Sequence, residues 1–121
     1  MQQHKIFEKQ EGDAWFNRNK SVLIPCNAKE CVAMPKLDWP THFIKSLKFK
    51  RALEIGCANG WRLANIKRKG ALCFGTDISK LAIKDGKKRF KGINLSVAPS
   101  HRQPFKDPSF DLIIISYVLH W

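Results

Sequence analysis

The sequence predicts an α/β fold with a doubly wound parallel sheet. Its 121 residues suit one domain with a single core. From residue 51 onward, short apolar runs alternate with glycine turns and with segments of helical periodicity. Apolar runs separated by helices are typical of parallel strands that are covered on both faces. Together these observations predict alternating strands and helices joined by right-handed crossovers.

Residues 1–40 are expected to form an irregular N-terminal extension, because prolines at positions 25, 35 and 40 interrupt any long helix. The domain itself is expected to cover residues 41–121. It begins with a short helix for which Thr41 is a plausible N-cap. The residues predicted to face inward from this helix are Phe43, Ile44 and Leu47.

Four strands and two further helices are predicted after this point. The first strand is predicted at "RALEI", followed by the glycine turn "GCANG" and by a helix at "WRLANIKRKG" that ends at Gly70. The second strand is predicted at "ALCFGT", the next helix at "DISKLAIKDGKKRF" and the third strand at "GINLSVA". After the loop "PSHRQPFKDPS", the fourth strand is predicted at "FDLIIISYV".

The chain is strongly basic, with 22 Lys and Arg against 10 Asp and Glu and a formal net charge of +12. Such a balance favours a polyanionic partner such as RNA. The spacing of the clearest lysine series fits one face of the helix predicted around "DISKLAIKDGKKRF", as expected for a solvated outer face, so RNA is possible but not favoured. Its members are Lys80, Lys84, Lys87, Lys88 and Lys91.

No segment approaches the roughly 20 apolar residues of a membrane span, so no membrane partner is expected. The opening "MQQHKIFEKQEGDAWF" lacks the apolar stretch of a secretory signal, which favours a cytoplasmic protein. The four cysteines are then expected to stay reduced. Cys26 and Cys31 lack the further ligands of a zinc site, so no metal is predicted.

The stretch "ALEIGCANG" places two glycines, which have no side chain, just after the first predicted strand. Gly56 and Gly60 allow a ligand to approach the backbone, and the following helix directs its unpaired N–H groups at the same space. A dinucleotide site would show G-x-G-x-x-G, but the middle glycine is replaced by Ala58 and the bulky Trp61 follows the last one. The carboxylate of Glu54 suits a ligand that carries an ammonium and a sulfonium better than a pyrophosphate.

Asp77 ends the second strand in "GTDIS". A carboxylate at this place can accept two hydrogen bonds from a ribose diol. By itself such an aspartate is most often a helix N-cap, a role also open to Ser79. In combination with the glycine turn, Asp77 favours ribose binding.

The segments "ALEIGCANG", "GTDIS" and "PFKDPSFDLIIISYVLHW" resemble the cofactor-binding half of class I S-adenosylmethionine-dependent methyltransferases, over about residues 50–121. The resemblance implies a Rossmann-like sheet and S-adenosyl-L-methionine as the cofactor. It also implies that Asp77 holds the ribose hydroxyls. The residues that it places along the methionine part of the cofactor are Glu54, Gly56, Cys57 and Gly60.

Adenine recognition is expected from the loop before the fourth strand. Many family members carry "GDAExLPF" there, whereas this chain has "APSHRQPF". The resemblance therefore implies that Ser100 and His101 contact adenine through backbone atoms. On the fourth strand, Asp111 lies about 17 Å from Ser116, at the end away from the chemistry. Asp111 is expected to be structural, whereas Ser116 and Tyr117 can face the transferred methyl group.

The segment "EGDAWFNRN" is similar to N-terminal segments of methylases encoded near sugar-biosynthesis genes. The similarity implies that Trp15 and Arg18 help to cover the cofactor. The alternative, a tryptophan packed on the core and a solvated arginine, stays equally open. His101 and His120 are candidate general bases, but neither has a recognisable partner in sequence, so no catalytic residue is assigned.

The family's sheet is larger, so the chain carries about four of seven strands and the fourth is left as an apolar edge. A truncated chain is therefore expected, completed by a further segment or a second chain. The first functional hypothesis is an S-adenosylmethionine-dependent methyltransferase, or its cofactor-binding fragment, with a small-molecule or saccharide acceptor. The alternatives are a non-catalytic cofactor-binding or interaction module and a basic RNA-binding methyltransferase fragment. Whether the chain is an enzyme by itself stays open.

Overall fold

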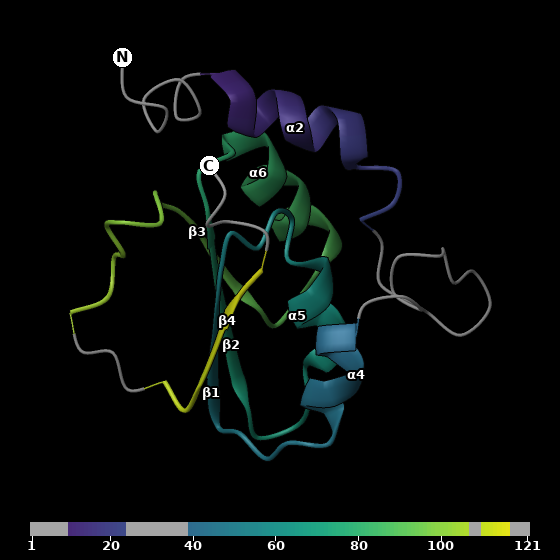
Figure 1. Cartoon of the computed structure of the whole chain (residues 1–121), viewed down its shortest axis with the longest axis vertical. Helices are drawn as coiled ribbons and strands as arrows, with labels where there is room; N and C mark the ends of the chain where they lie inside the picture. Colours follow the sequence, from purple (N-terminus) through teal and green to yellow (C-terminus); the bar gives the residue numbers. More distant parts are fainter. Residues whose placement is uncertain (1–9, 24–38, 107–109, 117–121) are drawn as a thin grey trace.

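The computed structural model describes residues 10–23, 39–106 and 110–116 (Figure 1). The strands pair in parallel in the order β3-β2-β1-β4, which confirms the predicted α/β class with an incomplete Rossmann-like sheet. The elements in chain order are α2 (Gly12–Asn19), α4 (Trp39–Lys45), β1 (Arg51–Ile55), α5 (Trp61–Ile66), β2 (Leu72–Asp77), α6 (Lys80–Arg89), β3 (Asn94–Val97) and β4 (Leu112–Ile115).

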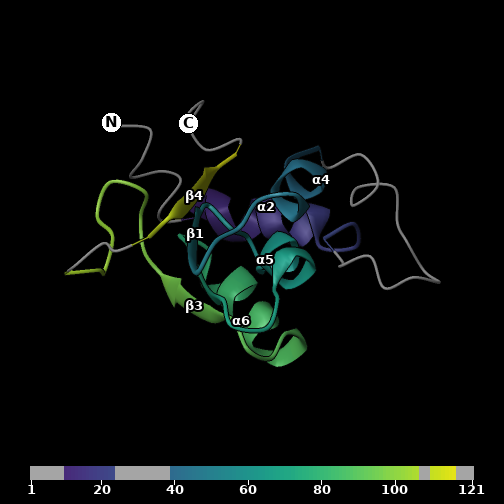
Figure 2. The same ribbon diagram turned by 90° about the horizontal axis from the view of Figure 1, so that it is seen from below.

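The core lies between one face of the sheet and the helices α4, α5 and α6, as Figure 2 shows. Alternate residues of each strand point to this face, because successive side chains of a strand lie on opposite sides. Apolar side chains of the helices meet them there. The buried cluster consists of Ile44, Phe49, Ala52, Cys57, Leu63, Ile66, Cys73, Ile83, Leu95 and Ile114.

The other face of the sheet carries no helix among the described residues, although helices were expected on both faces. Part of it is covered by three phenylalanines in edge-to-face contact, with ring centroids 5.1 to 5.8 Å apart. Ile113 and Ile115 of β4 remain 54% and 49% exposed. Within the described part of the chain, the sheet is therefore packed on one side and apolar and only partly covered on the other. The three rings belong to Phe74, Phe105 and Phe110.

The N-terminal region differs from the prediction. Part of the expected irregular extension is the helix α2, and the helix expected from Thr41 begins at Trp39. Thr41 is therefore inside the helix and not its N-cap. Its register buries Thr41 and Ile44, which are three positions apart, and so points Phe43 outward with 60% exposure. The inward placement predicted for Phe43 is wrong, and Leu47 is only half-buried. The domain division at residue 41 stays a prediction.

The helix α6 separates a charged face from a tightly packed one. Its lysine series is exposed, as predicted. Gly86, on the opposite side, is buried against the glycine turn, where a Cβ would lie 2.0 Å from the carbonyl oxygen of Asn59. Only glycine allows the helix to pass this close to the turn.

Gly86→Ala is expected to destabilise the fold by about 2 kcal/mol or more, because the clash outweighs the gain of about 1 kcal/mol in helix propensity. Urea unfolding measures the change. The matched control is Lys87→Ala, at an exposed neighbouring position, which should stay within about 0.5 kcal/mol of the unsubstituted chain. Equal stability of the two variants would contradict the close contact.

Asp111 fastens the start of β4 to the start of β1. Its carboxylate accepts hydrogen bonds from the backbone N–H groups of Lys50 and Arg51, both at 2.8 Å. These N–H groups lower the pKa of Asp111 below its usual value. The structural role predicted for Asp111 is thus confirmed.

Because the folded-state pKa of Asp111 is lowered, its stabilising effect is present above the ordinary aspartate pKa of about 3.9 and is lost as the pH falls through the folded value. Asp111→Asn should lower the melting temperature at neutral pH and flatten its fall in acid. Thermal unfolding at a series of pH values tests this. An unchanged acid dependence in the variant would count against the contact.

Candidate functional site

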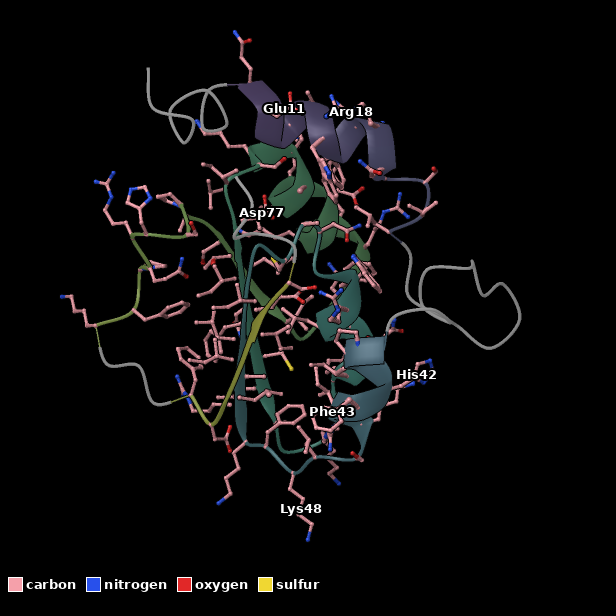
Figure 3. All side chains as sticks on the ribbon, viewed as in Figure 1. Glu11, Arg18, His42, Phe43, Lys48 and Asp77 are labelled. Atoms are coloured by element: carbon pink, nitrogen blue, oxygen red, sulfur yellow. The ribbon has the colours of Figure 1, made fainter. Side chains whose placement is uncertain are left out.

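The candidate site lies at the carboxyl ends of β1 and β2. The chain order runs from β1 outward through β2 to β3 and then returns to β4 on the other side of β1. Ligands of open parallel sheets bind outside the strand ends at such a reversal. Figure 3 shows Asp77 at this end of the sheet, close to α2.

The turn between β1 and α5 has three residues in the left-handed region. Gly56 and Gly60 have φ of +75° and +85°, and Ala58 has φ of +51°. Ala58, at the position of a middle glycine, adopts a conformation that costs a non-glycine residue about 1–2 kcal/mol. The N–H groups of Gly56 and Cys57 both donate to the carbonyl oxygen of Thr76, at 2.8 and 2.9 Å. The turn is therefore fastened to the end of β2.

Asp77 joins this turn to the start of α6. One carboxylate oxygen, Oδ2, accepts a hydrogen bond from the N–H of Ala58, and the other, Oδ1, accepts one from the N–H of Ser79, both at 2.8 Å. An ionised carboxylate offers about four acceptor positions, so two remain for a diol. Burial raises the pKa of Asp77, while the N–H groups of Ser79 and Ala58 act in the opposite direction.

Glu54, at the end of β1, is 1% exposed and forms an ion pair with Arg62 of α5. The guanidinium of Arg62 also stacks on the ring of Trp61, 4.8 Å from its centroid. The sequence placed Glu54 beside a cationic ligand but missed Arg62, because no spacing rule pairs a strand end with the next helix. Much of the negative charge of Glu54 is therefore already balanced within the protein.

Cys57 and Gly60 contribute mainly through backbone. The thiol of Cys57 is part of the core cluster, and burial, followed by the nearby carboxylates of Glu54 and Asp77, raises its pKa well above the usual value. It therefore remains a protonated thiol at neutral pH. A Cβ at Gly60 would lie 2.8 Å from Cδ1 of Ile93, so this glycine also serves the packing behind the turn.

The loop after β3 exposes both residues predicted to contact adenine, Ser100 and His101. The conformation of this loop depends on Gln103, a residue that the sequence analysis did not single out. Gln103 accepts a hydrogen bond from the hydroxyl of Thr76 at 2.8 Å and donates to the carbonyl oxygens of Pro99 at 3.0 Å and Ser100 at 3.3 Å. The side-chain amide thus holds the loop against the end of β2.

Comparison with known proteins decides the family. The model of a methyltransferase domain matches residues 53–121, more than half of the chain. The chain belongs to the methyltransferase-domain family. This agrees with the resemblance read from the sequence, and S-adenosylmethionine is the cofactor of that family.

Relatives of this methyltransferase domain are longer proteins. An uncharacterized protein of Methanocaldococcus jannaschii, MJ1123, is 35% identical over an alignment 121 positions long, which covers 96% of this chain and 48% of that protein. The chain therefore spans about half the length of its curated relative.

Two solved structures support the fold. The PH0226 protein of Pyrococcus horikoshii superposes with a TM-score of 0.64 at 20% identity, over 89% of this chain and 53% of that one. The plantazolicin methyltransferase BpumL, solved with a monoazolic desmethylPZN analog and SAH, gives a TM-score of 0.61 at 17% identity. That match covers 92% of this chain and 42% of BpumL.

The contacts of Trp15 and Arg18, both on α2, fit the second alternative, a tryptophan packed on the core and a solvated arginine. Trp15 is half-buried against a second apolar cluster, and the exposed Arg18 forms an ion pair with Glu11. Ser116, directly after β4, is half-buried.

Several residues singled out in the sequence, namely Cys26, Cys31, Tyr117 and His120, lie outside the described residues. In the ranges that the structure describes, no group of His, Cys, Asp and Glu side chains is arranged to hold a metal ion. None of the described helices is both long and apolar enough to cross a membrane.

Glu54→Gln is expected to destabilise the methyltransferase domain by about 3 kcal/mol, because it leaves the buried guanidinium of Arg62 without its counter-charge. Urea unfolding checks this. Glu11→Gln, which removes the exposed pair with Arg18, is the matched control and should cost about 0–1 kcal/mol. Combining Glu54→Gln with Arg62→Gln should be less harmful than Glu54→Gln alone. Equal losses for Glu54→Gln and Glu11→Gln would contradict this account.

Proposed function

We propose that this chain binds S-adenosylmethionine and is the cofactor-binding part of a methyltransferase that acts on a small-molecule or saccharide acceptor. The observation that carries the proposal is the Asp77 carboxylate at the strand-order reversal. It is held by two backbone N–H groups and retains acceptor positions for a ribose diol. The family membership supports the same cofactor.

The other contacts follow from position along the sheet. The turn residues Gly56, Cys57 and Gly60 would present backbone to the methionine part, since the thiol of Cys57 faces the core. Glu54 would act on the ammonium group from beneath the turn, with its field reduced by Arg62. The exposed loop residues would contact adenine, and Ser116 at the end of β4 would lie toward the transferred methyl. The loop residues are Ser100 and His101.

Methyl transfer is a direct displacement, in which the sulfonium supplies the methyl group when the cofactor is bound. The protein then mainly has to align the acceptor atom with that methyl and exclude water. The described turn and strand ends would hold the cofactor. No described residue is assigned as a general base.

A small-molecule or saccharide acceptor is favoured over a nucleobase. The chain has "SYVLHW" after the fourth strand where amino-methyltransferases of nucleobases carry a Pro-Pro turn. BpumL, a neighbour in fold, is solved with a desmethylPZN analog beside SAH, which supports a small ligand as an occupant of this fold.

Two other functions have specific support. The net charge of +12 supports a basic RNA-binding methyltransferase fragment, whereas the exposed lysine series along α6 suits a solvated outer face and does not favour RNA. RNA affinity would then fall steeply with salt, and a flat salt dependence would remove this alternative. The open sheet face of Ile113 and Ile115 favours a non-catalytic module that pairs with another surface. Cofactor binding without transfer would support that alternative.

The place of β4 at one edge of the described sheet suggests that a further segment or a second chain completes the sheet beyond it. We also propose a cytoplasmic location. The support is that Cys57 and Cys73, within the described residues, are both free thiols, which suits a reducing compartment.

The test is isothermal titration of the 121-residue chain with S-adenosylmethionine, S-adenosylhomocysteine and NAD. The first two should bind and NAD should not. Asp77→Ala should weaken binding about 100-fold, because two hydrogen bonds to a charged acceptor contribute about 1.5 kcal/mol each. Glu11→Gln, which changes a half-buried acid directly before α2, is the control and should leave binding unchanged. Unchanged affinity in a folded Asp77→Ala variant would overturn the proposal.

A further inference from the structure

We infer that Asp13 of α2 is a positioning residue for the cofactor site, acting through Ser79 on the carboxylate of Asp77. The inference rests on the proposed function, because it takes Asp77 as the ribose ligand. Asp13 lies outside residues 53–121, the part of the chain that matches the methyltransferase domain. The inference therefore extends the site to a helix that the family match does not include.

The three residues form a continuous chain of hydrogen bonds. The hydroxyl of Ser79 donates to Oδ1 of Asp13 at 2.6 Å and accepts from the N–H of Ala82 at 3.0 Å. The same oxygen of Asp13 accepts a bond from the N–H of Leu81 at 3.1 Å. The backbone N–H of Ser79 in turn donates to Oδ1 of Asp77.

Asp13 therefore completes the N-terminal cap of α6 from another helix. The first N–H groups of a helix have no partner within the helix, and negative charge is favourable at that end. Because the hydroxyl of Ser79 has both its donor and its acceptor roles filled, the residue has little freedom to turn. Ser79 is also 2% exposed. Its N–H is thereby kept aimed at Asp77.

Apolar packing holds α2 in the position that this contact needs. Phe16, three residues after Asp13, shares the same face of the helix. It is 3% exposed and belongs to a buried cluster with Ala58 of the glycine turn, Trp61 of α5 and Ala82 of α6. One face of α2 thus contacts both segments that bind the carboxylate of Asp77.

The charge of Asp13 gives the arrangement a measurable signature. After burial, which is the largest cause, the nearby negative charge of Asp13 also raises the pKa of Asp77. The N–H groups of Ser79, Ala58 and Ile78 act in the opposite direction. Removing the charge of Asp13 while keeping its oxygen should therefore lower the pKa of Asp77. A residue that stabilises the fold from a place remote from Asp77 would not produce this change.

The experiment compares Asp13→Ala with Asp13→Asn in the 121-residue chain, titrated with S-adenosylhomocysteine over a series of pH values. Asp13→Ala should weaken binding about tenfold at neutral pH, because residues that share a hydrogen-bond network commonly show interaction energies of this size. Asp13→Asn keeps an acceptor oxygen and should bind nearly as well as the unsubstituted chain. Its loss of binding in acid should begin at a lower pH, because ribose hydroxyls donate to the ionised carboxylate. Glu11→Gln is the control, and it should change neither the affinity at neutral pH nor the pH at which binding is lost.

A double substitution separates positioning from general stability. If Asp13 acts through Asp77, Asp13→Ala should cause no further loss of affinity in a chain that already carries Asp77→Ala. Any one of three results would overturn the inference. They are additive losses of affinity in the double variant, full affinity in Asp13→Ala, and an unchanged pH midpoint of binding in Asp13→Asn. Should Asp13→Ala not fold, the pH series of Asp13→Asn still decides it. Failure of the unsubstituted chain to bind, or of Asp77→Ala to weaken binding, would instead overturn the proposed function.

Discussion

The carboxylate of Asp77 is the contact on which the arrangement of the site depends. Its two oxygens accept N–H groups from the turn after β1 and from the start of α6, both at 2.8 Å. One side chain thus joins two neighbouring strand ends at the place where the strand order reverses. Burial raises the pKa of Asp77 more than the N–H groups lower it, so the carboxyl group lies at a partly desolvated position. Asp13 and Ser79 extend this network to the N-terminal helix.

Further contacts of the glycine turn are made by Asn59. Asn59 is 1% exposed, and its side chain donates to the carbonyl oxygen of Leu23 and to Asp85 while accepting the N–H of Trp61. Its carbonyl oxygen lies against Gly86, where no side chain fits. The segment after α2, the start of α5 and the middle of α6 therefore meet at one residue. Contacts that hold the turn in this way would lower the entropy cost of binding a ligand there.

The sequence predicted what is encoded locally. The four strands, α5, α6 and the positions of Glu54 and Asp77 followed from apolar runs, glycine turns and the order of motifs. Contacts between distant segments could not be predicted in this way. The ion pair of Glu54 with Arg62 and the bond between Asp13 and Ser79 depend on how the helices cross the sheet, which no spacing rule encodes. The helix α2 was missed because its eight residues are short and mostly polar, and its stability comes from packing on the turn.

The most direct test is a crystal structure of this chain with S-adenosylhomocysteine. The account predicts both ribose hydroxyls on the carboxylate of Asp77, with the bonds from the N–H groups of Ala58 and Ser79 retained. It also predicts α2 in place, with Asp13 on the hydroxyl of Ser79. A ribose bound elsewhere, or an Asp77 side chain turned away from the glycine turn to reach the ligand, would contradict it.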